Sequence, residues 1–104
     1  MVTPEMLLFL AGKMGVAGHI ALNRVWIKPD MAHSFSPHVS DADFGLLVVW
    51  AWQEGIVVDN QGCSILTEYD GGPTFIVDHD STPDSIRAAA VVAVCRALGW
   101  GEKK

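Results

Sequence analysis

The order of apolar and polar residues first predicts two helices. Residues 6–14 are mostly apolar and follow Thr3-Pro4, a favourable N-cap and a favourable first helical residue. A second apolar run follows Ser40 and recurs at spacings of three and four residues, which is the period of one helical face. This stripe consists of Phe44, Leu47, Val48 and Ala51. Because Gly15 and Gly55 come directly after the two runs, we expect each helix to end there.

Three short strands and a third helix are predicted next. The strand segments are 56–58, 63–69 and 74–77. Turns at 60–62 and 70–72 are short enough for antiparallel pairing of neighbouring strands. Both faces of this sheet carry apolar residues, which favours cover on both sides. The last helix opens at Thr82-Pro83 and is rich in alanine. The sequence therefore predicts an α/β (α+β) fold, a three-layer α-β-α sandwich in the order α-α-β-β-β-α with a three-stranded antiparallel sheet.

The length of 104 residues predicts a single domain over 1–104. Within it, residues 16–40 are expected to form a long irregular connection, because Pro29 and Pro37 bracket a polar segment that carries histidines. A connection of this length is unusual in a small domain and is often functional.

Composition and charge limit the partners of this chain. Half of the residues are hydrophobic and 18% are charged, so we expect some apolar surface to meet a partner or a second copy. The net charge is −5 and the few cations are scattered, which argues against nucleic-acid binding. No apolar run approaches the ~20 residues that span a bilayer, which argues against a membrane protein. The chain does not open on a basic signal-peptide region, so Cys63 and Cys95 are expected to be reduced thiols of a cytoplasmic protein.

Candidate catalytic chemistry is sparse. Asp78-His79-Asp80 is the densest group of potential metal ligands, but adjacent residues of a strand point to opposite faces. Acids before a helix also stabilise its N-terminus, so capping competes with metal binding as an explanation. Neither a phosphate-binding glycine loop nor a Gly-x-Ser-x-Gly elbow is present. We therefore predict no catalytic residue, no cofactor, no metal and no enzyme activity.

Three segments resemble the phage ABA sandwich domain family, whose members are small proteins of tailed phages and prophages. The first is Ala11-Gly12-Lys13-Met14-Gly15, and the second is Phe35-Ser36-Pro37 with Ser40. The third is the run from Ser81-Thr82-Pro83 through Ala90. The resemblance implies the sandwich fold and a phage or prophage origin, and it carries no biochemical activity.

These observations favour a phage accessory protein that acts by binding a host or phage component. The alternative is a small-molecule protein that binds or sequesters a nucleotide-like signal. In that alternative Arg24 would meet a phosphate and Trp26 would stack on a base. Lys28, His33 and His38 lie in the same segment and complete the candidate ligand or partner surface. A further alternative is a minor component of the virion.

The second helix also predicts self-association, with a homodimer as the expected state. Its apolar stripe is sufficient to attach the helix to the sheet. The residues left on its other flank are Leu46, Val49, Trp50 and Trp52. A second copy could cover this flank, or the 16–40 segment could fold over it in a monomer.

Overall fold

The computed structural model of this chain describes residues 2–16, 18–22, 24–27, 33–69 and 74–100, with nine elements between Pro4 and Ala97. The helices are α1 (Pro4–Lys13), α2 (Asp41–Gln53) and α3 (Pro83–Ala97). The first three strands are β1 (Gly18–Ala21), β2 (Arg24–Ile27) and β3 (His33–Ser34). The others are β4 (Ile56–Asn60), β5 (Ser64–Tyr69) and β6 (Thr74–Asp78).

Hydroxyl N-caps start all three helices. The side-chain oxygens of Thr3, Ser40 and Thr82 each accept a hydrogen bond, 3.2–3.3 Å long, from the backbone N–H three residues later. Gly15 and Gly55 follow α1 and α2 with φ of +80° and +82°, a backbone conformation that favours glycine. These starts and ends confirm the helix boundaries that the sequence predicted.

A three-stranded antiparallel sheet in the order β4-β5-β6 is also confirmed. Thr67 at its centre pairs with Val58 on one side and with Phe75 on the other. The 60–62 turn connects β4 to β5, while the predicted turn at 70–72 lies outside the described residues. The α+β class and the order α-α-β-β-β-α therefore hold, with β1 to β3 inserted between the first two helices.

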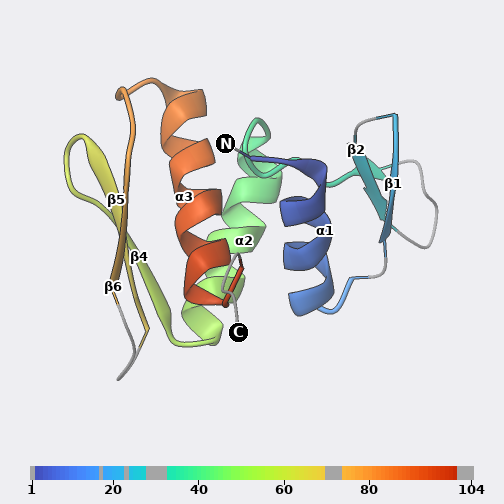
Figure 1. Cartoon of the computed structure of the whole chain (residues 1–104), viewed down its shortest axis with the longest axis horizontal. Helices are drawn as coiled ribbons and strands as arrows, with labels where there is room; N and C mark the ends of the chain where they lie inside the picture. The colour runs from blue at the N-terminus through green and yellow to red at the C-terminus, as the bar shows by residue number, and fades with distance from the viewer. Residues whose placement is uncertain (1, 17, 23, 28–32, 70–73, 101–104) are drawn as a thin grey trace.

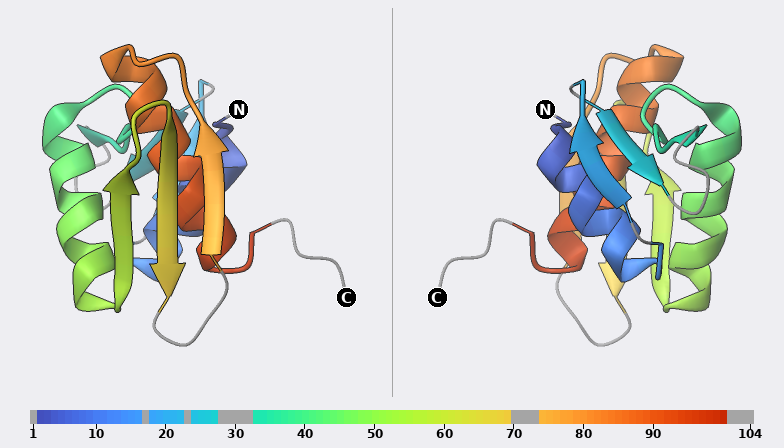
Figure 2. Two further views of the ribbon diagram at one scale, coloured as in Figure 1. Left: turned by 90° about the vertical axis from the view of Figure 1, so that its left-hand side faces the viewer. Right: turned by 90° about the vertical axis from the view of Figure 1, so that its right-hand side faces the viewer.

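The layers differ from the expected α-β-α arrangement. All three helices lie between the β4-β5-β6 sheet and the β1-β2-β3 sheet (Figure 1). The outer face of the β4-β5-β6 sheet is uncovered in the left view of Figure 2, and Val57 and Ile76 on it are 52% and 59% exposed. Apolar residues on this face had suggested a covering layer, but α1 packs instead on β1, β2 and α3.

In its described residues, the 16–40 segment contains three strands where the sequence suggested an irregular connection. β1 and β2 form a hairpin in which Ile20 faces Val25, and two residues of β3 extend it into a sheet. Val25 is fully buried and faces the core. Leu22 in the hairpin turn has φ of +54°, and a leucine carries none of the usual sequence signals for that conformation.

The core has two parts that meet at α3. One lies among α1, β2, α2 and α3, and Leu10, Val25 and Leu47 are fully buried in it. In the other, alanines of α3 pack on Ile65 of β5. The hydroxyl of Thr67 on β5 donates a 3.3 Å hydrogen bond to the carbonyl of Ala93. The small side chains of α3 therefore let it approach the sheet closely, which fixes the position of the surfaces described next.

Candidate functional site

The most exposed apolar surface on a helix is one side of α2. Leu46, Val49 and Trp52 are 64%, 50% and 59% exposed, and their spacing of three residues places them on one broad face. We call these three residues the α2 flank. Trp50 was predicted to belong with them, but it is only partly exposed and packs against the core cluster. The structure therefore assembles three of the four residues predicted for self-association.

The predicted ligand surface around Arg24 and Trp26 is only partly assembled. Exposed Arg24 lines a pocket of about 270 Å³ to which His38 also contributes. Trp26 does not line this pocket, and its indole N–H donates a 2.9 Å hydrogen bond to the carbonyl of Ala21. Lys28 and the side chain of His33 lie outside the described residues. Of the predicted residues whose side chains the structure describes, Arg24 and His38 line one pocket and Trp26 does not.

A second and larger pocket lies between β6 and α3. Its volume is about 490 Å³, and we call it the β6–α3 groove. Val77 and Asp78 of β6 form one wall, and His38 and Val39 contribute to it from the turn before α2. Its α3 lining includes Asp84, Ala88, Val92 and Arg96. Sequence reasoning missed this groove, although the density of alanines in α3 indicated a helix with little side-chain bulk.

His38 contributes to both pockets and is partly buried. Its Nδ1 atom is buried and has no hydrogen-bond partner among the described residues. Burial lowers the pKa of the imidazole below its ordinary value of 6.5, and the negative charge of Asp84 partly opposes this shift. The neutral imidazole is therefore the form that the folded chain favours.

The lowered pKa of His38 predicts acid sensitivity. The unfolded chain takes up this proton at a higher pH than the folded chain, so the stabilisation is complete above pH 6.5 and is lost as the pH falls through the folded-state pKa. We expect the free energy of unfolding in urea to decrease from pH 7 to pH 5, and to decrease less in His38→Gln. His19→Gln, at an exposed strand position, serves as the control. Equal pH dependence of the wild type and His38→Gln would contradict this prediction.

The Asp78-His79-Asp80 segment forms structural hydrogen bonds. Asp78 accepts one from the Ser64 hydroxyl at 2.9 Å. His79 Nδ1 accepts one from the backbone N–H of Ser81, so its Nε2 carries the proton and donates to the side-chain oxygen of Asn60 at 3.0 Å. The three side chains thus turn to different partners. Within the described ranges, no three His, Cys, Asp or Glu side chains gather closely enough to hold a metal ion.

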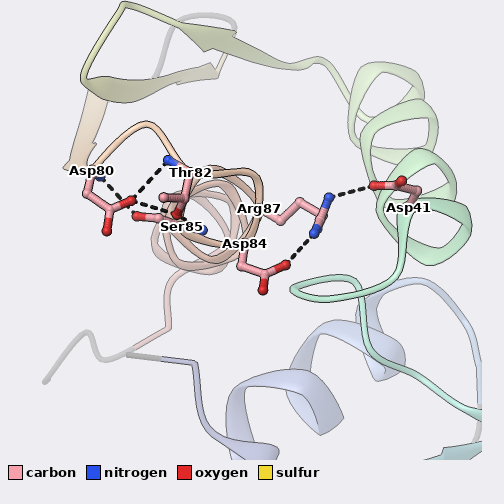
Figure 3. A network of polar contacts seen from close by, with 6 residues as sticks. All are labelled: Asp41, Asp80, Thr82, Asp84, Ser85 and Arg87. Carbon is pink, nitrogen blue, oxygen red and sulfur yellow. Dashed lines mark hydrogen bonds and ion pairs between the residues drawn. The ribbon is translucent and has the colours of Figure 1, made fainter.

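Asp80 positions Thr82, the residue that caps α3. Its carboxylate accepts hydrogen bonds from the hydroxyl and the backbone N–H of Thr82, at 2.7 and 3.0 Å (Figure 3). Its own N–H donates to the Ser85 hydroxyl. The hydrogen bonds from Thr82, and then that involving Ser85, lower the pKa of Asp80. The carboxylate therefore stays ionised beside the groove at neutral pH.

Arg87 leaves α3 on the side opposite this cap and connects two helix starts. Its guanidinium contacts Asp41 of α2 at 2.6 Å and also pairs with Asp84 (Figure 3). The carboxylates are 91% and 75% exposed, so each ion pair stabilises the fold by ~1 kcal/mol at most. This network orients the start of α3 and carries no sign of catalysis.

The two cysteines are not bonded to each other: Cys63 is exposed and Cys95 is buried. Burial raises the pKa of the Cys95 thiol to about 12, so it is protonated at neutral pH. A protonated thiol is a poor nucleophile, and Cys95 therefore acts as a small core residue.

The α2 flank and the β6–α3 groove are the two surfaces on which a functional proposal can be built. In the part of the chain that the structure describes, no helix has the length and apolar character needed to cross a bilayer. Comparisons of the chain with models of protein families, with curated proteins and with solved structures find no match.

Proposed function

We propose that this chain is a non-enzymatic interaction protein whose contact surface is the α2 flank. The observation that carries the proposal is the exposure of Leu46, Val49 and Trp52, each half or more accessible on one side of a well-anchored helix. Large apolar side chains gathered on one surface are typical of binding sites. Tryptophan is also enriched among the residues that dominate binding energy.

A second copy of the chain is the proposed occupant. Across a two-fold axis the same three residues would face one another, so six large side chains would lose their contact with water. Complete burial of one such side chain contributes ~1.5–3 kcal/mol, and those of the flank are half or more exposed before contact. Their sum is comparable with the cost of association, ~4–15 kcal/mol, so the flank supports a moderate rather than a tight dimer.

The competing explanation, a flank covered by the 16–40 segment, has less support. The described strands of that segment pack against α1 and against each other. The exposure of the α2 flank therefore calls for a different partner.

Light scattering tests the proposed dimer. We expect wild-type protein at high micromolar concentration to approach twice the monomer mass of 11.2 kDa, and Val49→Lys to return it to the monomer mass. Val57→Lys is the matched control, because Val57 is 52% exposed on another surface and faces Glu68, which can pair with the new lysine. A wild-type monomer at these concentrations, or equal dissociation by both variants, would contradict a dimer formed through the α2 flank.

A phage or prophage origin and a place in the host cytoplasm remain part of this proposal. The origin is supported by the three sequence segments that resemble the phage ABA sandwich family. The neighbouring genes are the direct test, and a tail, lysis or anti-defence neighbourhood would also indicate the partner. Consumption of a metabolite by the purified protein would contradict the non-enzymatic assignment.

The small-molecule alternative has weaker geometric support. Its pocket beside Arg24 measures about 270 Å³, whereas ligand pockets usually measure ~300–1,000 Å³. Trp26, the proposed stacking residue, does not line it. A nucleotide-like molecule released on denaturing the protein from infected cells would nevertheless favour this alternative. Recovery of the protein in purified particles would favour the third one, a minor virion component.

A further inference from the structure

The β6 strand has one unpaired edge. It is the last strand of the β4-β5-β6 sheet, and no described residue pairs with its other side. The backbone N–H of His79 donates to the carbonyl of Cys63 at 2.9 Å, which identifies this pair as hydrogen-bonded. Because bonded and non-bonded pairs alternate along an antiparallel ladder, Val77 and Phe75 bond to β5. Thr74, Ile76 and Asp78 therefore direct their backbone groups to the open edge.

Within its described residues, Thr74–Asp78, this edge lacks the usual protection against pairing. Native proteins block exposed edges with lysine, proline or a bulge. β6 reads Thr-Phe-Ile-Val-Asp, pairs with β5 in a continuous register and carries an exposed Ile76. The edge can therefore accept a further strand.

The β6–α3 groove lies beside the same edge. Val77 and Asp78 belong both to the strand and to the groove wall, and His38 and Val39 form part of its boundary. Ala88 and Val92 on α3 give it an apolar lining with little bulk. A strand added to β6 would direct every second side chain toward α3 and into this groove. The volume of about 490 Å³ suits such side chains. Residues of both β6 and the 38–39 turn line the groove, which favours a single extended segment over a whole domain as its occupant.

The two ends of the groove carry opposite charges. Asp80 and Asp84 lie beside the start of α3, and Arg96 lies at its other end. Arg87 offsets the charge of Asp84, while the groups bonded to Asp80 are uncharged. Asp84 and Arg96 are 12 positions apart, which is ~18 Å along a helix and ~5–6 residues of an extended chain.

We propose that the β6–α3 groove binds an extended peptide segment that adds to the β6 edge as a fourth, antiparallel strand. The segment places small aliphatic side chains over Ala88 and Val92. It carries a lysine or arginine at the Asp80–Asp84 end and an acidic residue at the Arg96 end. Because the added strand runs antiparallel to β6, it begins at the end of the groove where β6 finishes, and the basic residue therefore lies N-terminal to the acidic one. This mode of recognition takes affinity from main-chain hydrogen bonds and specificity from alternate side chains. The inference rests on the proposed interaction role and assigns it a second surface.

Fluorescence anisotropy with a defined peptide tests the inference. The probe is fluorescein-Lys-Thr-Val-Thr-Val-Thr-Glu-amide, and its controls exchange the two charged residues or N-methylate the central threonine. Ile76→Pro removes the N–H that faces the open edge and leaves the ladder to β5 intact. Ile76→Thr, the matched control, loses the apolar side chain but keeps the N–H. Ala88→Phe fills the groove. Circular dichroism establishes that each variant is folded.

We expect saturable binding to the wild type and, within about threefold, to Ile76→Thr. Ile76→Pro, Ala88→Phe and the N-methylated peptide should each weaken binding at least tenfold, and the charge-exchanged peptide should also bind less tightly. Val49→Lys should bind the probe normally, so a failure of the α2 dimer is distinguishable from a failure of the groove.

Three results would overturn the inference. One is no saturable binding to the wild type up to 1 mM peptide, and another is equal affinity of the wild type and Ala88→Phe. The third is a wild-type oligomer that does not bind the probe and that Ile76→Pro dissociates. In that case a second copy of the chain would occupy the edge.

Discussion

Replacing Leu10 with alanine is expected to lower the free energy of unfolding by about 2–5 kcal/mol. Leu10 is fully buried where α1 meets β2, α2 and α3. The substitution removes apolar contacts and leaves a cavity that the surrounding elements can fill only in part. Urea unfolding followed by circular dichroism measures the change.

Leu22→Ala is the matched control for this prediction. It makes the same chemical change at a residue that is 87% exposed, so we expect a change within about 0.5 kcal/mol. A loss below 1 kcal/mol for Leu10→Ala, or equal losses for the two variants, would mean that α1 is not packed into the core as described.

Replacing Asp43 with alanine is expected to destabilise the fold by about 1–4 kcal/mol. Asp43 is 4% exposed, and its carboxylate accepts a 2.8 Å hydrogen bond from the backbone N–H of Ser36. Loss of this acceptor leaves that N–H unpaired, at a cost of about 1–3 kcal/mol. The favourable interaction of the carboxylate with the N-terminus of α2 is lost as well and is worth about 0.3–1 kcal/mol.

Two further variants separate these contributions. Asp41→Ala changes a 91% exposed carboxylate in the same helical turn and should cost no more than about 1 kcal/mol. Asp43→Asn keeps an oxygen acceptor and should recover part of the stability lost in Asp43→Ala. Equal effects of Asp41→Ala and Asp43→Ala would show that helix charge, rather than the bond to Ser36, accounts for the loss.

Asp43 also shows how far a local motif can be predicted. Ser40-Asp41-Ala42-Asp43 has the pattern of a capping box, with an acid three residues after the N-cap, and Ser40 does cap the N–H of Asp43. The carboxylate of Asp43 reaches Ser36 in the preceding segment. The bond from the N–H of Asp43 to Ser40 is local and can be predicted from the sequence. The bond to Ser36 depends on where the tertiary fold places residues 34–37.

The groove was beyond sequence reasoning for a related reason. Val77, Ala88 and Arg96 show no shared pattern along the chain, and they line one space only because β6 and α3 pack side by side. The unpaired edge of β6 follows from the position of a strand in the sheet order, which the strand's own sequence does not encode.

The sequence by itself determined the ends of the helices and the pairing of β4, β5 and β6. Caps, glycines and short turns act over three or four residues, so their effect is readable from neighbours in the chain. Only the tertiary structure decided the layers, because an apolar face indicates that an element is buried but does not indicate which other element packs on it. It placed β1 to β3 beyond α1, left Ile76 exposed, and buried part of Trp50 while Trp52 faces outward. Which apolar residues remain available for a partner is therefore a property of packing.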